Sequence, residues 1–67
     1  MTDYTFSAGR MERAEARAAE ARLRHAGFDA HASTRYSGWT IRVSSEREDV
    51  VETVARLEPK LRFESSR

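Results

Sequence analysis

FDAHASTRYSGWTIRVSS, residues 28–45, is the stretch that decides the fold of this chain. Apolar and small side chains alternate with polar ones over residues 28–36 and again over residues 39–45, which is the period-two pattern of a half-buried strand. Ser37 and Gly38 separate the two runs and have the length and composition of a hairpin turn. The stretch therefore predicts two antiparallel strands joined by a two-residue loop.

The register of this hairpin follows from the position of the loop. With Ser37 and Gly38 as the loop, one face carries the inward-facing residues and the other carries the polar ones. The predicted inward pairs are Tyr36 with Trp39, Thr34 with Ile41, and Ala32 with Val43. The predicted outward pairs are Arg35 with Thr40, Ser33 with Arg42, and His31 with Ser44. A shift by one residue would turn every side chain to the wrong face.

The residues before the hairpin predict a strand and a helix. Residues 4–7 alternate apolar and polar side chains, and Gly9 ends that strand. Residues 10–26 are dominated by Ala, Glu, Arg and Leu, contain no β-branched residue, and are followed by Gly27. These residue types favour a helix, and glycine suits the position just past its C-terminus. A helix is therefore predicted over residues 10–26.

The residues after the hairpin predict a second helix and a last strand. Ser45 and Glu48 have the spacing of a capping box, in which the two side chains close the first turn of a helix. Valine and leucine then recur at helical spacing until Pro59, so the helix is predicted over residues 46–58. Residues 61–64 alternate again and predict a strand.

The predicted order of elements is β-α-β-β-α-β in a single domain, residues 1–67. This order with a central hairpin defines the α+β ferredoxin-like sandwich, a four-stranded antiparallel sheet with both helices on one face. The other face of the sheet is left open and polar. By alternation, the side chains predicted on this open face are Thr5, Ser7, His31, Ser33, Arg35, Thr40, Arg42, Ser44, Arg62 and Glu64.

The first predicted helix has an apolar side and an arginine-rich side. Two stripes of apolar residues at helical spacing are predicted to face the sheet: Ala16, Ala19, Leu23 and Ala26, and beside them Met11, Ala14, Ala18 and Ala21. The opposite sector, which Glu20 interrupts, contains Arg10, Arg13, Arg17 and Arg24. The helix is therefore predicted to lie close to the sheet and to present guanidinium groups outward.

Two interpretations of these arginines stay open. They form a solvated face, partly bonded to the acidic second helix at Glu46, Glu48, Asp49 and Glu52, or they dock on an acidic protein surface or on phosphates. Guanidinium groups suit both carboxylate and phosphate partners. The basic residues of the open face have the same two interpretations. The candidate partner-binding residues are Arg10, Arg13, Arg17, Arg24, Arg35, Arg42 and Arg62.

No residue pattern indicates catalysis, a cofactor or a metal site. The chain has no cysteine, its two histidines lack ligands at metal spacing, and no phosphate-binding loop or nucleophile motif occurs. We therefore predict no catalytic, cofactor-binding or metal-binding residue and expect a protein that is not an enzyme. No run of apolar residues approaches a membrane span, and no secretory signal is present, so a cytoplasmic protein is expected.

The charge and the aromatic residues favour a protein partner. A net charge of +1 with 34% charged residues differs from the strongly basic balance of a dedicated nucleic-acid binder. RNA-binding domains of this topology stack bases on aromatic side chains of the open face, whereas here every aromatic residue falls on the inward set. Nucleic-acid binding through basic residues of the open face or first helix is the alternative. A monomer and a homodimer paired through the strand edge at residues 31–35 both stay open.

Two families share parts of this pattern. The run AEARLRHAGFDAHA, residues 19–32, followed by GWTIRVSSEREDVVETVARL, residues 38–57, resembles SPOR domains. It is also similar to the B-type regulators of ribonuclease E activity, small cytoplasmic inhibitors with a comparable hairpin. The second resemblance implies a protein-binding inhibitor but transfers no binding residue. In size and build the chain is similar to small phage-encoded inhibitors such as anti-CRISPR proteins, so we expect a small stand-alone regulator or inhibitor that covers a partner surface.

Overall fold

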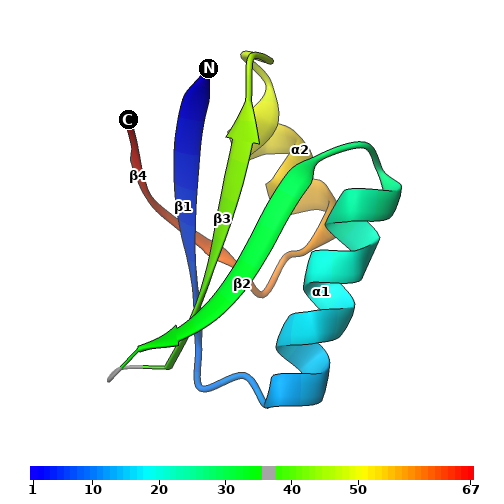
Figure 1. Ribbon diagram of the computed structural model, residues 1–67, viewed down its shortest axis with the longest axis vertical. Helices are drawn as coiled ribbons and strands as arrows, with labels where there is room; N and C mark the ends of the chain where they lie inside the picture. Colours follow the sequence, from blue (N-terminus) through cyan, green and yellow to red (C-terminus); the bar gives the residue numbers. More distant parts are fainter. Residues whose placement is uncertain (36–37) are drawn as a thin grey trace.

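The computed structural model describes residues 1–35 and 38–67, and it contains the six predicted elements in the predicted order (Figure 1). The elements are β1 (Thr2–Gly9), α1 (Arg13–His25), β2 (Asp29–Arg35), β3 (Gly38–Ser45), α2 (Val50–Leu57) and β4 (Arg62–Ser66). The strands form one sheet with the order β2-β3-β1-β4, and every neighbouring pair is antiparallel. Figure 1 shows α2 behind the sheet and α1 beside β2, and buried residues of both helices join one core with the sheet, so the predicted α+β ferredoxin-like architecture is confirmed.

The core lies between the helices and the two central strands. Phe6 of β1 and Ile41 and Val43 of β3 are the large central side chains on the helix-facing side of the sheet, and each is at most 2% exposed. Against them pack fully buried side chains of both helices: Ala19 and Leu23 of α1, and Val50 and Val54 of α2. Ala16 of α1 is also fully buried. Because Ala16 and Ala19 are small, α1 lies close to the sheet, as the first apolar stripe predicted.

The second apolar stripe of α1 is a wrong prediction. Ala14, Ala18 and Ala21 are exposed, as is Ala26 at the end of the first stripe, and Met11 is only half-buried. The helix makes most of its sheet contacts with β2 and fewer with β3, so one stripe suffices to cover them. The other alanines contribute their helix propensity, which needs no burial.

The predicted starts of both helices are also wrong. The chain first turns after β1, where Gly9 has a φ of +58° and the Met11 N–H donates to the Ala8 carbonyl at 3.2 Å, so α1 begins at Arg13 instead of residue 10. No capping box forms, because Ser45 Oγ accepts a hydrogen bond from the Arg47 N–H at 3.1 Å. This local turn delays α2 until Val50 instead of residue 46.

The hairpin register differs from the predicted one by two residues. The observed pairs are Thr34 with Trp39, Ala32 with Ile41, Ala30 with Val43 and Arg35 with Gly38, whereas the predicted partner Tyr36 lies outside the described residues. A shift by two keeps every side chain on its predicted face. Gly38 belongs to β3 with a φ of +120°, and a Cβ there would lie 1.9 Å from the carbonyl oxygen of Gly9. The glycine is therefore required by the close approach of β1 and by its positive φ.

The strands differ from the predictions at their ends. The observed bounds are Thr2–Gly9, Asp29–Arg35, Gly38–Ser45 and Arg62–Ser66, against predictions of 4–7, 28–36, 39–45 and 61–64. The largest change is in β4, where the register shifts so that Phe63 pairs with Phe6 and Ser65 pairs with Thr5. This bulge keeps Ser65 on the open side of the sheet. The pairing continues to Arg67, whose backbone exchanges hydrogen bonds of 2.8 and 2.9 Å with Asp3.

Candidate binding site on the open sheet face

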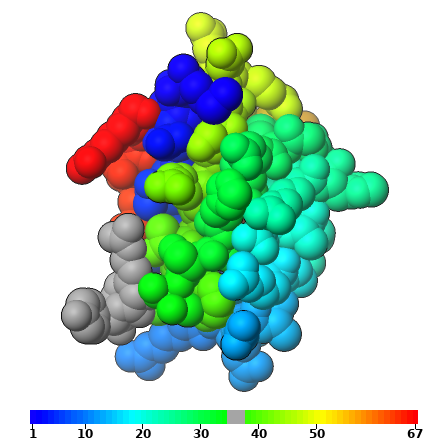
Figure 2. Space-filling model, in the orientation of Figure 1, coloured from blue at the N-terminus to red at the C-terminus, as the bar shows by residue number. Residues whose placement is uncertain are grey.

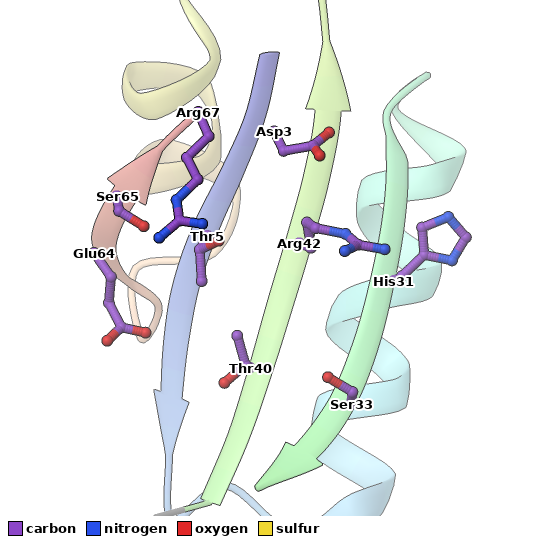
Figure 3. A pocket seen from close by; sticks show the side chains of 9 residues that line it. All are labelled: Asp3, Thr5, His31, Ser33, Thr40, Arg42, Glu64, Ser65 and Arg67. Carbon is purple, nitrogen blue, oxygen red and sulfur yellow. The ribbon is translucent and has the colours of Figure 1, made fainter. Parts of the chain in front are cut away.

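The open face of the sheet holds a shallow depression with a volume of about 590 Å³, which we call the basin (Figure 3). Nine polar residues line it: Asp3, Thr5, His31, Ser33, Thr40, Arg42, Glu64, Ser65 and Arg67. Strand alternation predicts six of these side chains correctly. Ser65 and Arg67 were missed because they follow the bulge in β4, and Asp3 because β1 begins earlier than predicted.

Two guanidinium groups dominate the charge of the basin. Arg42 lies in β3 between Thr5 of β1 and His31 of β2, and Arg67 extends from the end of β4 over β1 (Figure 3). In residues 1–35 and 38–67, no ion pair joins either of these guanidinium groups to a carboxylate. Each therefore retains its donors for an external acceptor.

Two carboxylates lie in the same basin. Asp3 accepts a hydrogen bond of 2.6 Å from the hydroxyl group of Ser44, which fixes one of its oxygens. Glu64 comes from the bulge of β4 and is exposed. The basin thus presents positive and negative groups side by side, with the hydroxyl groups of Thr5, Ser33, Thr40 and Ser65 between them. Such a surface can bind by hydrogen bonds and paired charges of both signs.

His31 forms the rim of the basin toward β2. Its Nδ1 lies 3.3 Å from a terminal nitrogen of Arg24, and its Nε2 lies 2.9 Å from Asp29 Oδ1. A guanidinium group can only donate, so Nδ1 accepts and Nε2 carries the proton that is donated to Asp29. These contacts hold the ring in one tautomer and one orientation. Within the described residues, no group of His, Asp and Glu side chains could hold a metal ion.

Glu20 joins α1 to the outer edge of β2. Its Oε2 accepts the Ala32 N–H at 2.7 Å, and Arg24 Nε donates to the Ala30 carbonyl at 2.8 Å. Glu20 also forms ion pairs with Arg17 at 3.3 Å and Arg24 at 3.7 Å. We call Arg17, Glu20 and Arg24 the Glu20 cluster. The prediction that Glu20 lies in the outward sector of the helix is therefore wrong, because its side chain turns toward β2 and the residue is only 9% exposed.

The hydrogen bond from the backbone shifts the titration of Glu20. The Ala32 N–H stabilises the charged carboxylate and lowers the pKa of Glu20 below 4.5; burial opposes this shift, and Arg17 and Arg24 add to it. Arg17 also lies over the ring of Trp39, with 5.5 Å from its guanidinium carbon to the ring centroid. The Glu20 cluster is thus bound within the chain.

Arg22 connects the two helices. Its Nε and one terminal nitrogen donate to the two carboxylate oxygens of Glu58 at 2.6 and 2.7 Å, and Glu58 is only 4% exposed. This bidentate contact raises the pKa of Arg22 above its ordinary value. The predicted acidic partners of the α1 arginines were residues 46–52, but in the described chain the partner on the second helix is Glu58. Asp49 instead pairs with Arg47 at 2.7 Å.

The structure does not bring the seven predicted arginines together. Arg17 and Arg24 belong to the Glu20 cluster, and Arg10 precedes α1. Arg13 is the first residue of α1; it and Arg10 are exposed, and within the described residues no ion pair involves them. They lie outside the basin.

The three predicted arginines of the open face also separate. Arg42 lines the basin, whereas Arg62 lies on β4 opposite Ser7, is exposed and does not line it. Arg35 ends β2, and its side chain lies outside the described part of the structure. The sequence therefore identified one of the two basin arginines.

Comparison of the chain with protein-family models, curated proteins and solved structures finds no match. The resemblance to SPOR domains and to regulators of ribonuclease E stays a prediction. Among the described residues, no helix is long and apolar enough to cross a membrane.

Proposed function

We propose that this chain is a non-enzymatic protein-binding module, a small regulator or inhibitor that covers a partner surface, and that the basin is its contact. The observation that supports the basin is the state of its arginines. Arg42 and Arg67 form no ion pair in the described residues, whereas Arg17, Arg22 and Arg24 of α1 are bonded within the chain. Arginine is enriched, with tryptophan and tyrosine, among the residues that anchor protein interfaces, and a guanidinium group with free donors suits carboxylate partners.

The mixed charge of the basin favours a protein partner over a nucleic acid. Asp3 and Glu64 lie among the arginines and would repel a continuous row of phosphates. Among the described residues, no aromatic side chain lines the basin, so these residues offer no stacking platform for bases. A partner surface that places carboxylates against Arg42 and Arg67, and donors against the two acids, would complement it.

The bonding of His31 supports a role without catalysis. Nδ1 of His31 would have to be free to take a proton from a substrate, and here it accepts a hydrogen bond from Arg24. The basin also lies open on the face of the sheet, which suits the covering of a surface more than the enclosure of a small substrate. A cytoplasmic location belongs to the same proposal, since a chain without cysteine is suited to a reducing compartment.

An affinity pull-down from a lysate of the source organism, with and without nuclease, tests this proposal. The decisive variant is Arg42→Glu/Arg67→Glu, and the matched control is Arg10→Glu/Arg13→Glu, which reverses two unpaired charges outside the basin. We expect one stoichiometric protein partner that survives nuclease, is lost with the basin variant and is kept with the control.

Two other results would contradict the proposal. Recovery that depends on nucleic acid, with affinity that falls steeply as salt rises, would favour the nucleic-acid alternative. Loss of the partner with the control variant alone would move the contact from the basin to the start of α1.

A further inference from the structure

The two edges of the sheet are covered differently. Along β2, the outward carbonyl of Ala30 and the outward N–H of Ala32 are bonded to Arg24 and Glu20 of α1. All five residues of β4, at the other edge, are exposed. Figure 2 shows α1 in cyan against β2 in green, whereas β4 in orange and red forms the opposite margin of the molecule in this view. The edge at residues 31–35, through which a homodimer was one of the two open alternatives, is thus partly occupied.

The backbone of β4 has hydrogen-bonding groups that point away from the sheet. Arg67 and Asp3 exchange two backbone hydrogen bonds, so they form a hydrogen-bonded pair of the antiparallel ladder. In such a ladder the next residue turns its N–H and C=O to the opposite side. Alternation therefore directs these groups of Ser66 toward the free edge, and likewise those of Phe63, which lies opposite Phe6.

An apolar side chain accompanies this edge. Phe63 lies on the helix-facing side of β4 and is 45% exposed. Its ring contacts that of Phe6 edge to face, with 5.7 Å between the ring centroids. One face of Phe63 is thus packed on the core while much of the ring remains in solvent, which costs free energy that a partner strand would recover.

We propose that a second copy of this chain pairs with β4, antiparallel and about a twofold axis that passes through Phe63. In this register the two Phe63 residues lie opposite each other on the helix-facing side. Arg62 of each copy then lies opposite Glu64 of the other, on the open face. Opposite charges at directly paired positions stabilise a ladder, and here symmetry forms the pair twice.

Other registers are disfavoured by the same residues. An axis through Glu64 would place two carboxylates opposite each other, and an axis through Arg62 would place two guanidinium groups opposite each other. An axis through Glu64 would also set Phe63 against Ser65, which the bulge keeps on the open face. Of these three axes, only the one through Phe63 places opposite charges against each other.

Pairing in this register would make one sheet of eight strands. The twofold axis is perpendicular to the sheet, so the open faces of both copies lie on the same side. The two basins would then lie on either side of the new strand pair, because Glu64 and Ser65 line the basin and belong to β4. The dimer would therefore present a repeated polar surface to a partner.

Sedimentation equilibrium of the wild type and of charge-reversed variants tests the pairing. We expect a monomer of 7.7 kDa at low concentration and twice this mass at high concentration. Arg62→Glu and Glu64→Arg should each weaken the dimer by about tenfold, and the double variant Arg62→Glu/Glu64→Arg should restore it, because the two charges exchange places. Circular dichroism confirms that each variant is folded.

A single cysteine in this cysteine-free chain gives a second, independent readout. Phe63→Cys places two thiols opposite each other across the axis, at a spacing that permits a disulfide. Thr34→Cys on the β2 edge is the matched control. We expect rapid oxidation to a covalent dimer for the first variant and slow oxidation for the second.

The proposal is overturned by a wild type that stays monomeric up to about 1 mM. At this concentration even a dimer with a dissociation constant of about 1 mM would be populated. It is equally overturned by a dimer that neither single charge reversal weakens, or by faster crosslinking at Thr34→Cys than at Phe63→Cys, which would place the contact elsewhere.

Discussion

The β2 edge and the β4 edge of this sheet both have backbone groups that could pair with another chain, and the two edges are protected in different ways. Along β2, Glu20 and Arg24 of α1 bond to the backbone that would otherwise be free. Along β4, all five residues are exposed, and the edge is short, bulged and charged. Both devices are known to limit uncontrolled pairing, but only the second leaves backbone groups accessible. The difference shows that the backbone groups of the β2 edge are bonded within the chain, whereas those of the β4 edge can still bond to another strand.

Hydrogen exchange should show the largest difference between the two edges. The Ala32 N–H is bonded to a buried carboxylate, so it exchanges only when α1 separates from the sheet. The Ser66 N–H is directed to the free edge. In monomeric protein at low concentration, we expect the Ala32 amide to exchange about a thousandfold more slowly than the Ser66 amide, measured by NMR. Similar rates would mean that the Glu20 cluster does not hold the β2 edge.

Removal of the edge carboxylates should give the next largest difference. Glu20→Ala leaves the Ala32 N–H and two guanidinium groups without their partner, and we expect the free energy of unfolding to fall by about 1–2 kcal/mol. Glu64→Ala removes an exposed carboxylate of the β4 edge and should change it by less than about 0.5 kcal/mol. Urea denaturation at low protein concentration measures both values. Equal losses would contradict the contrast between the edges.

The pH dependence of stability should sharpen the contrast. Because the pKa of Glu20 is lower in the folded chain than its ordinary 4.5, the unfolded chain binds the proton more readily. The contribution of Glu20 is complete above pH 4.5 and is lost as the pH falls through the folded pKa. Urea denaturation between about pH 6 and pH 3 should therefore show a smaller acid-induced loss for Glu20→Gln than for the wild type.

The exposed Arg47–Asp49 pair supplies a control for this pH dependence. Asp49 also has a lowered pKa, chiefly because Arg47 donates hydrogen bonds to it. Asp49→Asn should therefore remove only its own part of the acid-induced loss. If Glu20→Gln has the same pH profile as the wild type, the carboxylate of Glu20 is not held in its charged form by the β2 edge.

The basin arginines should have the smallest effect on stability. Arg42→Glu/Arg67→Glu breaks no ion pair in the described residues, so we expect its free energy of unfolding to stay within about 0.5 kcal/mol of the wild type. Thermal denaturation followed by circular dichroism measures this. A large loss would show that these arginines support the sheet, and would weaken their assignment as a binding site.

The sequence predicts the order and faces of the elements well but not their exact pairing. Alternation assigns Ile41 and Val43 to the core and Arg42 to the open face, because a strand has a period of two. A register shift by two residues leaves this pattern unchanged, so the pattern alone could not reveal it. The bulge in β4 could not be predicted from alternation either. It interrupts the period of two, so alternation counted from Arg62 does not place Arg67 on the open face.

The arginines of α1 show a second limit of the sequence. Helical spacing places Glu20 in the outward sector, but the Ala32 N–H attracts its carboxylate toward β2. Backbone groups at a sheet edge have no signature in the pattern of side chains. The pairing of Arg22 with Glu58 was missed for a similar reason, because Glu58 lies at the end of α2, where the position of the chain depends on the packing of both helices.

The contact between Gly38 and Gly9 has a consequence for how far this sequence can vary. Both residues have a positive φ, and so has Gly27, but a Cβ at Gly27 would meet nothing within 4 Å. Substitution at Gly27 would therefore meet only backbone strain. At Gly38, even alanine would collide with the backbone of another strand. In a library of all single substitutions, position 38 should accept no other residue, whatever surface the chain is selected to bind.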